Sequence, residues 1–429
     1  MTWGLRAPPR PPTLRARSES VPSASAVTRP GTFAALGVRN YRLYWLGLIC
    51  YVLGHRAEYV TFAWLVWEVT REPLYLGYLG LAQGLPLIVF QLFGGVLADR
   101  ADRVRLLLVT QALTALKLTL AFALTVSGFA RVEYLLALAA LSSIFRAFDE
   151  PTRMSLVPQL IDRARLPNAI ALGSIPWQAS RIIGPSITGI LIAAFGGSVG
   201  LGLAALCSYA ALALYSRLRV PHTAAAHGHR RMLPELMEGV SFVARDFVFA
   251  ALVCLALFNA LFGLSYVTLL PIFADVYFAA GSVGYGLLQA AHGVGALVGT
   301  LTIATIAWRI RRPGRALLIG AAVMGVMLIV FSRAPVIGLA LAVLPIVGFS
   351  NTFYLTQVST FLQQKVPDHL RGRVMSLYAL CWNLLPLGGL LGGVLAAAVD
   401  ARFAVLFGGV MVAANALIFL MSRRLRGIG

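Results

Sequence analysis

The sequence contains about a dozen apolar runs, each long enough to cross a lipid bilayer as a helix, separated by short polar or Pro/Gly-containing segments. A hydrocarbon core of about 30 Å needs roughly 20 apolar residues in an α-helix. With 59% hydrophobic and only 12% charged residues, the chain carries more apolar side chains than a soluble fold of 429 residues can bury. These features predict an all-α membrane protein.

Reading the apolar runs against their polar breaks predicts twelve transmembrane helices. They cover residues 41–68, 74–98, 104–127, 132–152, 168–194, 198–218, 248–273, 284–308, 315–332, 335–362, 373–398 and 402–421. The longest polar stretch, 222–246, lies between the sixth and seventh runs, and its spaced apolar residues could form an amphipathic helix on the membrane surface. The predicted parts are an N-terminal six-helix bundle, a central loop, a C-terminal six-helix bundle and a basic tail, at 33–219, 220–247, 248–421 and 422–429.

The first 32 residues are rich in Pro, Arg, Ser and Ala and contain a single acid, Glu19. They lack the apolar core of a secretory signal, so we expect a disordered cytoplasmic tail. Two alternatives stay open, because a transit peptide or an upstream extension from a misassigned start would have the same composition.

The basic residues predict the orientation of the chain. Of the 36 Lys and Arg, we place Arg71, Arg131, Arg333 and Arg402 in loops on one side, and a few within helices. The others lie on the opposite side with both termini, and positively charged loops face the cytoplasm. We therefore expect a multi-pass protein of the bacterial inner membrane with both termini and the central loop in the cytoplasm.

The net charge of +20 does not indicate nucleic-acid binding, because the basic residues form short clusters between apolar runs. The four cysteines lie inside apolar stretches without CxxC spacing, which predicts neither a disulfide framework nor a metal site. A solvated loop is favoured over a metal site for His222, His227 and His229. We predict no metal and no cofactor.

The loop after the second run reads Gly94-Gly95-Val96-Leu97-Ala98-Asp99-Arg100-Ala101-Asp102-Arg103-Val104-Arg105. This segment resembles the signature loop G-x-L-A-D-R-x-G-R-x-R of the major facilitator superfamily, with Asp102 where Gly is usual. The resemblance implies twelve helices in two pseudo-symmetric six-helix bundles, the major facilitator fold, and a gating role for the loop. The gating residues would be Gly95, Asp99, Arg100 and Arg103, with small residues allowing close helix packing and charges forming a latch.

Several other segments, from about residue 33 onward, resemble the enterobactin-exporter-like and transmembrane secretion effector branch of that superfamily. Arg146 falls where the superfamily's fourth-helix motif has its arginine, but Glu150 replaces the glycine. Arg146–Glu150 and Asp149–Arg153 are i,i+4 pairs on a helix, which explains them structurally. The resemblance offers a gating role as the alternative for Arg146, Asp149 and Arg153. In that alternative Arg103 and Asp149 join a charge network that is remade between conformations.

The fifth run resembles the exporter pattern G-x-x-x-G-P-x-x-G through Gly184, Pro185 and Gly189, although Ser180 stands at the first glycine. A Gly-Pro helix is bent and thin on one face, so a neighbour can pack closely against it. The pattern favours efflux over uptake, while packing alone would also explain the glycines. A faint repeat offset by 205 residues relates Leu172, Trp177 and Gly184 to Leu377, Trp382 and Gly389.

Ionisable residues deep in a membrane are costly and therefore candidates for function. Glu58 is the carboxylate that we place well inside the bilayer. Burial would favour its protonated form, and a nearby Arg181 would favour the ionised form, so movement between the two environments could couple protons to transport. A permanent structural ion pair, or a wet position near the outer mouth, stays open. His292 is the third coupling candidate, with an interhelical hydrogen bond as the alternative.

Polar and aromatic side chains within the helices are candidates for a substrate cavity, although interhelical bonds or interface anchoring would also explain them. They are His55, Trp64, Asn259, Tyr266, Asn351, Tyr354, Gln357, Trp382 and Asn383.

The leading hypothesis is a monomeric, proton-coupled exporter of small amphipathic molecules, siderophore-like or drug-like, working by alternating access. An uptake permease is the alternative, and a non-transporting scaffold or receptor is a third. An ATP-driven pump would need a GxxxxGK[ST] loop in this chain or in a partner, and this chain has none. A membrane enzyme is disfavoured because the sequence has no HExxH or GxSxG motif.

Overall fold

The computed structural model describes residues 33–220, 232–310, 312–422 and 425, and helices account for nearly all regular structure in these ranges. The first six long helices are α1 (Arg39–Thr70), α2 (Pro73–Arg100), α3 (Arg103–Val126), α4 (Val132–Leu160), α5 (Leu166–Phe195) and α6 (Gly197–Tyr215). The later helices are α7 (Met232–Arg245), α8 (Phe247–Phe258), α9 (Tyr266–Ile272), α10 (Gly281–Ile306), α11 (Pro313–Ser332), α12 (Ile337–Lys365), α13 (Asp368–Asn383), α14 (Leu385–Ala398) and α15 (Ala401–Met421). The all-α prediction is confirmed for the described part of the chain.

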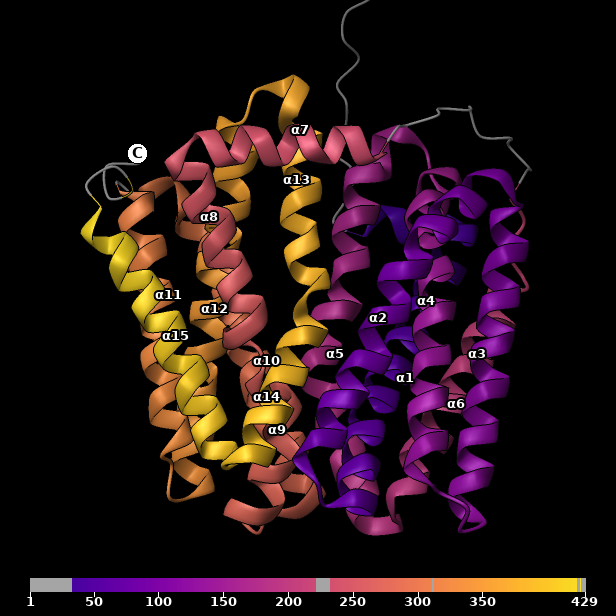
Figure 1. The fold of residues 1–429 in the computed structure, drawn as a ribbon. Helices are drawn as coiled ribbons and strands as arrows, with labels where there is room; N and C mark the ends of the chain where they lie inside the picture. The colour runs from indigo at the N-terminus through magenta and orange to yellow at the C-terminus, as the bar shows by residue number, and fades with distance from the viewer. Residues whose placement is uncertain (1–32, 221–231, 311, 423–424, 426–429) are drawn as a thin grey trace, which may run out of the picture.

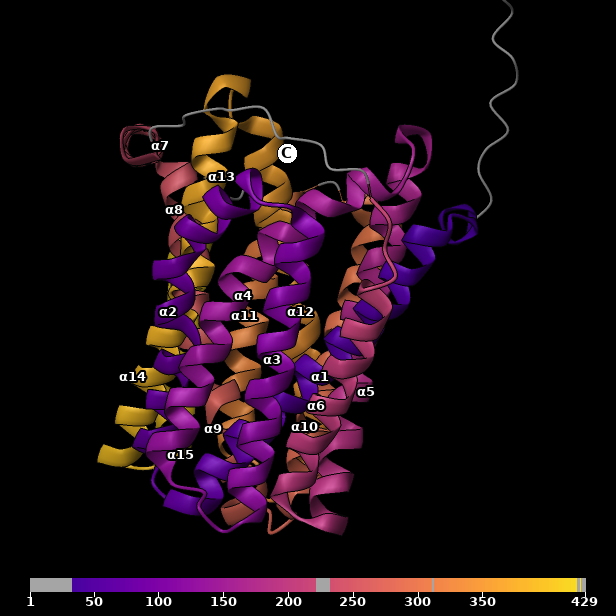
Figure 2. The same ribbon diagram turned by 90° about the vertical axis from the view of Figure 1, so that its right-hand side faces the viewer.

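Ten helical segments within the described residues are long and apolar enough to cross a membrane. The 32-residue α1 and the 29-residue α4 are long enough as well, but both contain several charged residues and are not among the ten. All the long helices except α7 run roughly parallel to one another (Figures 1 and 2). α7 lies across one end of the bundle, which we call the α7 face, and the other end is the opposite face.

The helices form two side-by-side groups, α1–α6 and α8–α15 (Figure 1). Within the first group α1 packs against α5 and α6, and α2 against α4; within the second, α10 packs against α12, and α11 against α12 and α15. The groups meet where α2 contacts α14 and where α5 contacts α10.

The polarity of the helix faces suits lipid rather than water outside the bundle. α3 exposes an apolar stripe containing Val109, Leu113, Leu116 and Leu120 at helical spacing, whereas Lys117 of the same helix is buried. Lipid tails solvate apolar side chains well and charged ones poorly, so charges point inward.

Three stretches differ from the predicted helix boundaries. α4 continues to Leu160 instead of ending at residue 152, and this extension buries Arg153, which we had placed in the loops of the basic side. The predicted helix 248–273 is interrupted by a π-helical segment at Asn259–Gly263 and continues into a second one at Phe273–Tyr277. The predicted helix 373–398 begins at Asp368 and breaks between α13 and α14 at Leu384.

A helix does lie in the predicted central segment, since α7 covers its second part. The predicted tail 1–32, the three central-loop histidines and most of the C-terminal tail fall outside the described residues.

Candidate functional site

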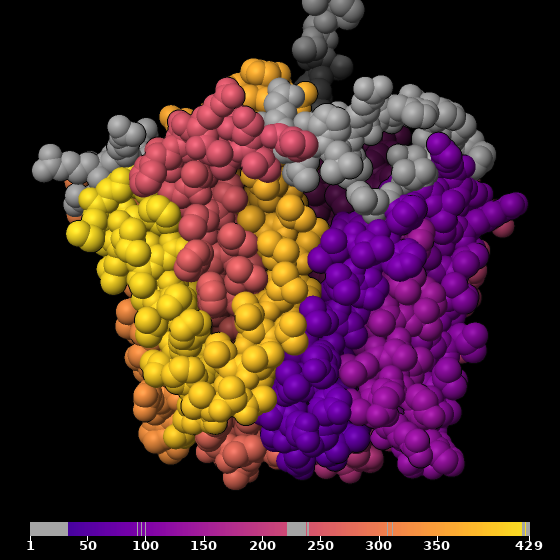
Figure 3. Space-filling model, in the orientation of Figure 1, coloured from indigo at the N-terminus to yellow at the C-terminus, as the bar shows by residue number. Residues whose placement is uncertain are grey.

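The two helix groups approach each other most closely toward the opposite face, first through α2 and α14. A Cβ placed on Gly393 would lie 2.9 Å from the Cα of Gly77, and one on Gly84 would overlap the ring of Pro386. In Figure 3 the yellow and indigo surfaces meet at the end away from α7. Glycine at these positions permits backbone contact between the groups.

The second close contact joins α5 and α10. A Cβ on Gly286 would lie 2.4 Å from the carbonyl oxygen of Pro185, and the Ser282 hydroxyl donates to the carbonyl of Gly189 at 3.1 Å. The Gly-Pro motif of α5 therefore packs against the other group, as expected for a thin helix face. Gly184 instead faces α1, where an added Cβ would lie 2.6 Å from Cβ of Arg56.

Polar contacts close the opposite face between the groups. The indole Nε1 of Trp67, near the end of α1, donates to Oδ2 of Asp275 at 2.9 Å. Arg71, which follows α1 with a positive φ of 55°, forms an ion pair with the same carboxylate. Deeper in α1, Trp64 stacks on Tyr285 of α10 with ring centroids 6.3 Å apart. These side chains tie α1 to the second group.

Glu58 is buried inside the first helix group, where its partner is Lys117 of α3. Lys117 Nζ donates to Oε1 of Glu58 at 2.6 Å, and the two residues are only 3% and 6% exposed. Ser142 of α4 accepts a hydrogen bond from Lys117 and donates one to Glu58. The expected countercharge, Arg181, forms no ion pair with Glu58 in the described structure.

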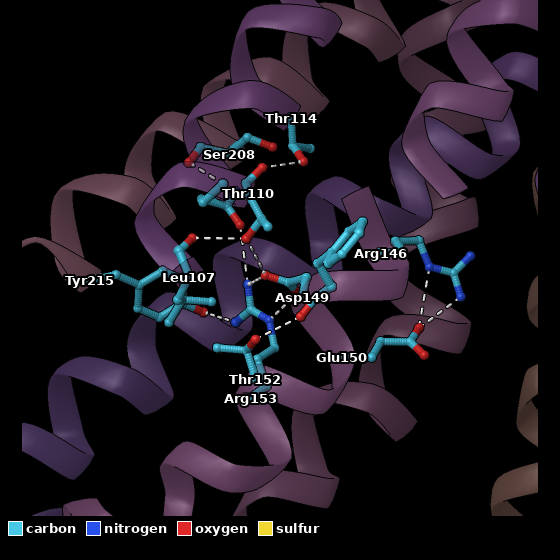
Figure 4. Close-up of polar contacts among 12 residues, drawn as sticks. Leu107, Thr110, Thr114, Arg146, Asp149, Glu150, Thr152, Arg153, Ser208 and Tyr215 are labelled. Carbon is cyan, nitrogen blue, oxygen red and sulfur yellow. Dashed lines mark hydrogen bonds and ion pairs between the residues drawn. The ribbon is translucent and has the colours of Figure 1, made fainter. Parts of the chain in front are cut away.

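Arg153 lies at the centre of a second buried network, and Figure 4 shows its contacts with Asp149 and Tyr215. Its guanidinium pairs with Asp149, donates to the hydroxyl of Tyr215 of α6 and to Oε1 of Gln111 of α3, and lies 3.7 Å from the ring centroid of Tyr51 of α1. The guanidinium of Arg153 therefore has several hydrogen-bond partners, as expected for a network that stabilises the fold.

Figure 4 also shows the predicted pair of Arg146 and Glu150, which are joined at 2.8 Å. Both i,i+4 pairs on α4 are therefore present. The alternative contact between Arg103 and Asp149 is not found, because Arg103 donates at 3.4 Å to the carbonyls of Ala98 and Ser155.

In the signature loop, Asp102 begins α3, where its carboxylate accepts hydrogen bonds from the backbone N–H groups of Val104 and Arg105. This cap explains an acid where Gly is usual. A Cβ on Gly94 would lie 1.9 Å from the carbonyl oxygen of Ala147 of α4, whereas one on Gly95 would meet nothing within 4 Å. Arg100 is exposed at the end of α2, and the side chain of Asp99 lies outside the described part.

The cavity candidates lie in different environments. His55 stacks on Tyr51 and lies edge-on to Trp177 of α5, facing the other helices of its group. Tyr266 is buried and shares a 2.7 Å hydrogen bond with Nδ1 of His292, so the interhelical bond considered for His292 is present.

The other candidates are divided between the interior and the surface of the second group. Asn259, Asn351 and Tyr354 are buried, Trp382 is exposed and Asn383 is half-buried. Gln357 lines a small, mostly apolar pocket with Leu317, Leu318 and Phe361. The structure does not gather these residues into one site.

Sequence reasoning missed Lys117 as a partner of Glu58, and it missed Ser142, Gln111, Tyr215 and Asp275 entirely. The signal for Lys117 was its place inside an apolar run, where an unpaired ammonium group is costly. Finding Asp275 would have required knowing which helix ends meet.

Parallel helices of spanning length, lipid-compatible outer faces and buried ion pairs define a polytopic membrane transport protein. The chain belongs to the transmembrane secretion effector family of the major facilitator superfamily, which matches residues 30–427. It is a membrane transporter and not an enzyme.

Named relatives and solved structures agree with this assignment. The staphyloferrin A transporter of Staphylococcus aureus is 24% identical over 79% of this chain and 85% of its own length. The multidrug efflux pump Tap of Mycolicibacterium fortuitum is 28% identical over 80% of this chain and 86% of its own length.

Among solved structures, a bacterial homologue of the human lysosomal transporter Spinster superimposes with a TM-score of 0.70 at 17% identity, covering 91% of this chain and 98% of that one. A POT family transporter in complex with 5-aminolevulinic acid gives a TM-score of 0.73 at 12% identity, covering 92% and 98%. These similarities establish the fold.

Proposed function

We propose that this protein is a proton-coupled secondary exporter of small amphipathic molecules, siderophore-like or drug-like, that works by alternating access. The observation that carries the proposal is the buried Glu58–Lys117 pair in a bundle whose two helix groups meet closely at one face. The relatives named for a siderophore and for multidrug efflux support the direction and the substrate class.

The proposed architecture has twelve spans in two pseudo-symmetric six-helix bundles, with α1 and α4 as spans and with α8/α9 and α13/α14 each counted as one. A symmetric pattern of contacts supports it. Gly184 of α5 faces α1, and Gly389, at the repeat offset of 205, faces Thr268 of α9. The pairing of α2 with α14 mirrors that of α5 with α10. The bundles correspond to residues 33–219 and 248–421.

We place the α7 face in the cytoplasm of a bacterial cell, with the membrane being the inner membrane. Arginines at the helix ends support this orientation. Arg100, Arg165 and Arg217 lie near the α7 face, while the opposite face carries fewer. The contacts through Asp275 would then lie on the external side.

Coupling is proposed to run through Glu58. Protonation of its carboxylate would remove half of the ion pair and release Lys117, and the free energy of that change would bias the two bundle arrangements. Arg181 and His292 remain the other proposed coupling residues, and Gly95, Asp99, Arg100 and Arg103 remain the proposed gate.

The test is transport into proteoliposomes under an imposed pH gradient, using a panel of amphipathic dyes and iron chelates. We expect Glu58→Gln to lose gradient-driven accumulation and to keep substrate exchange, while Glu133→Gln, at an exposed position at the start of α4, behaves like wild type. Gradient-driven transport at the wild-type rate in folded Glu58→Gln protein would remove Glu58 from the mechanism. Accumulation only in the uptake direction would support a permease.

A further inference from the structure

Arg56 lies at mid-length in α1, where its side chain forms no ion pair with an acid in the part of the chain that the structure describes. The stem of Arg56 packs against Gly184 of α5, and its Nε atom is buried without a hydrogen-bond partner. Glycine at position 184 makes room for this stem, since an added Cβ would lie 2.6 Å from Cβ of Arg56. The packing directs the guanidinium along the α5 side of α1.

Arg181 lies one helical turn before Gly184, at the contact between the two helix groups. A Cβ on Gly293 of α10 would lie 2.7 Å from the carbonyl oxygen of Arg181 and 3.2 Å from its Cβ. The side chain of Arg181 is exposed although it starts at mid-length of α5, so it borders an accessible space. No ion pair involves Arg181 or Arg56 within the described residues.

The neighbouring charges do not neutralise these two arginines. Arg56 is close enough to Arg181 and Arg146 for their charges to repel, and His292 of α10 lies within the field of Arg56 and Arg181. Glu58 lies two residues after Arg56, so it points about 200° away around the helix axis. Its charge is committed to Lys117.

A second acid of the same region, Glu150, is also committed, because it is paired with Arg146. Uncompensated guanidinium groups at this depth are costly, and such charges mark a site for a ligand of opposite charge. A guanidinium binds carboxylate or phosphate oxygens through two parallel hydrogen bonds.

We propose that Arg56 and Arg181 form an oxyanion-binding site between α1, α5 and α10, and that the transported molecule carries a carboxylate or a similar oxyanion. This inference rests on the transport function proposed above and adds the charge of the substrate. The hydrogen-bonded pair of Tyr266 and His292 borders the site from the second helix group.

The surroundings of the site favour an oxyanion attached to an apolar body. The ring of Tyr51 is buried against Arg153, but His55 and Trp177 beside it are half-buried and lie edge-on to each other. These two rings lie within one to two turns of Arg56 and Arg181 on the same two helices, toward the α7 face. Rings of this kind bind flat apolar groups. A molecule with its oxyanion at the arginines would place its apolar part against these rings.

The test is binding of naphthalene-2-carboxylate to the purified full-length protein in detergent, measured by equilibrium dialysis, with naphthalene-2-carboxamide as the neutral match. We expect binding of the carboxylate to weaken about tenfold or more in Arg181→Gln, in line with the loss of one charged hydrogen-bonded contact. Arg181→Lys should keep part of the affinity. Arg333→Gln, at an exposed arginine on the opposite face, is the control and should bind like wild type.

Equal binding of the carboxylate and the carboxamide, or wild-type affinity in folded Arg181→Gln, would overturn the proposal. Competition by sodium chloride as strong as by sodium naphthalene-2-carboxylate itself would do so too, since the site would then hold any small anion. Arg56→Gln provides an independent second variant. The measurement needs no transport, so carboxylate binding without gradient-driven transport would refute the exporter function alone. If gradient-driven transport depends neither on the charge of the probe nor on Arg181, the oxyanion site is refuted and the exporter function is not.

Discussion

At the scale of single residues, burial decides which charges this protein can tolerate. Lys117 and Glu58 lie 2.6 Å apart with Ser142 bonded to both, so each buried charge has hydrogen-bond partners within the protein. Removing one partner from a buried ion pair costs about 3–5 kcal/mol, because the other charge stays buried alone. Replacing both charges costs far less.

This asymmetry gives the first prediction. Lys117→Met and Glu58→Gln should each lower the thermal unfolding temperature of the detergent-solubilised protein, and the double variant should unfold at a higher temperature than either. The double variant should nevertheless lack proton-driven transport. Additive losses of stability in the double variant would show that the two side chains do not interact as a pair.

Sequence reasoning found Glu58 but assigned it the wrong neighbour, and the reason is geometric. Its depth followed from its place in an apolar run, which needs only the sequence. Its partner depended on which face of α1 meets α3. The sequence of a single membrane helix does not show which neighbouring helix each of its faces contacts. Arg181 was the plausible countercharge because it lies at a similar depth. It belongs to α5, however, whereas Glu58 faces Lys117 of α3.

At the scale of helices, the apolar runs predicted the positions and approximate ends of the long helices, because a bilayer requires long apolar segments. The errors in the predicted helix boundaries occur where a helix contacts other side chains inside the bundle and not lipid. α4 extends past residue 152 because Arg153 finds Asp149, Gln111 and Tyr215. The π-helical turns at Asn259–Gly263 and Phe273–Tyr277 leave no periodic signal in so apolar a run.

Helix packing at the signature loop supplies the second prediction. Gly94→Ala should destabilise the protein, because its Cβ would lie 1.9 Å from a backbone oxygen of α4, which cannot move aside independently. Gly95→Ala is the matched control. It meets nothing within 4 Å and should be neutral or stabilising by up to about 1 kcal/mol through helix propensity. Thermal unfolding of the two variants side by side checks this, and equal effects would contradict the packing of α2 on α4.

At the scale of the whole molecule, the proposed orientation places α7 in the cytoplasm. The third prediction uses exposed serines at the two faces, Ser216 after α6 on the α7 face and Ser127 after α3 on the opposite face. In a background without the four native cysteines, a membrane-impermeant maleimide applied to intact cells should label Ser127→Cys. It should label Ser216→Cys only after the cells are permeabilised. The reverse pattern would invert the topology.

The last prediction concerns the contacts that close the opposite face. Asp275 accepts a hydrogen bond from Trp67 and pairs with Arg71, and these contacts exist only while the two helix groups touch there. Because Arg71 is largely exposed, its ion pair contributes at most about 1 kcal/mol, and the indole hydrogen bond contributes about as much again. Asp275→Asn keeps an amide oxygen that can accept from Trp67 but loses the ion pair with Arg71. It should therefore shift the population toward arrangements open at this face by up to about fivefold.

A reporter cysteine at Ser282 measures that shift. Ser282 is buried at the α5–α10 contact, so Ser282→Cys is reached by an aqueous maleimide only when the face opens. In the Ser282→Cys background, Asp275→Asn should raise the labelling rate from the opposite side, and Asp246→Asn, at the start of α8 on the α7 face, should leave it unchanged. High salt should raise the labelling rate of Ser282→Cys protein that keeps Asp275, because salt screens the exposed ion pair between Asp275 and Arg71. An unchanged rate in Asp275→Asn would mean that backbone contacts at Gly286 and Gly393 hold the face closed without the carboxylate.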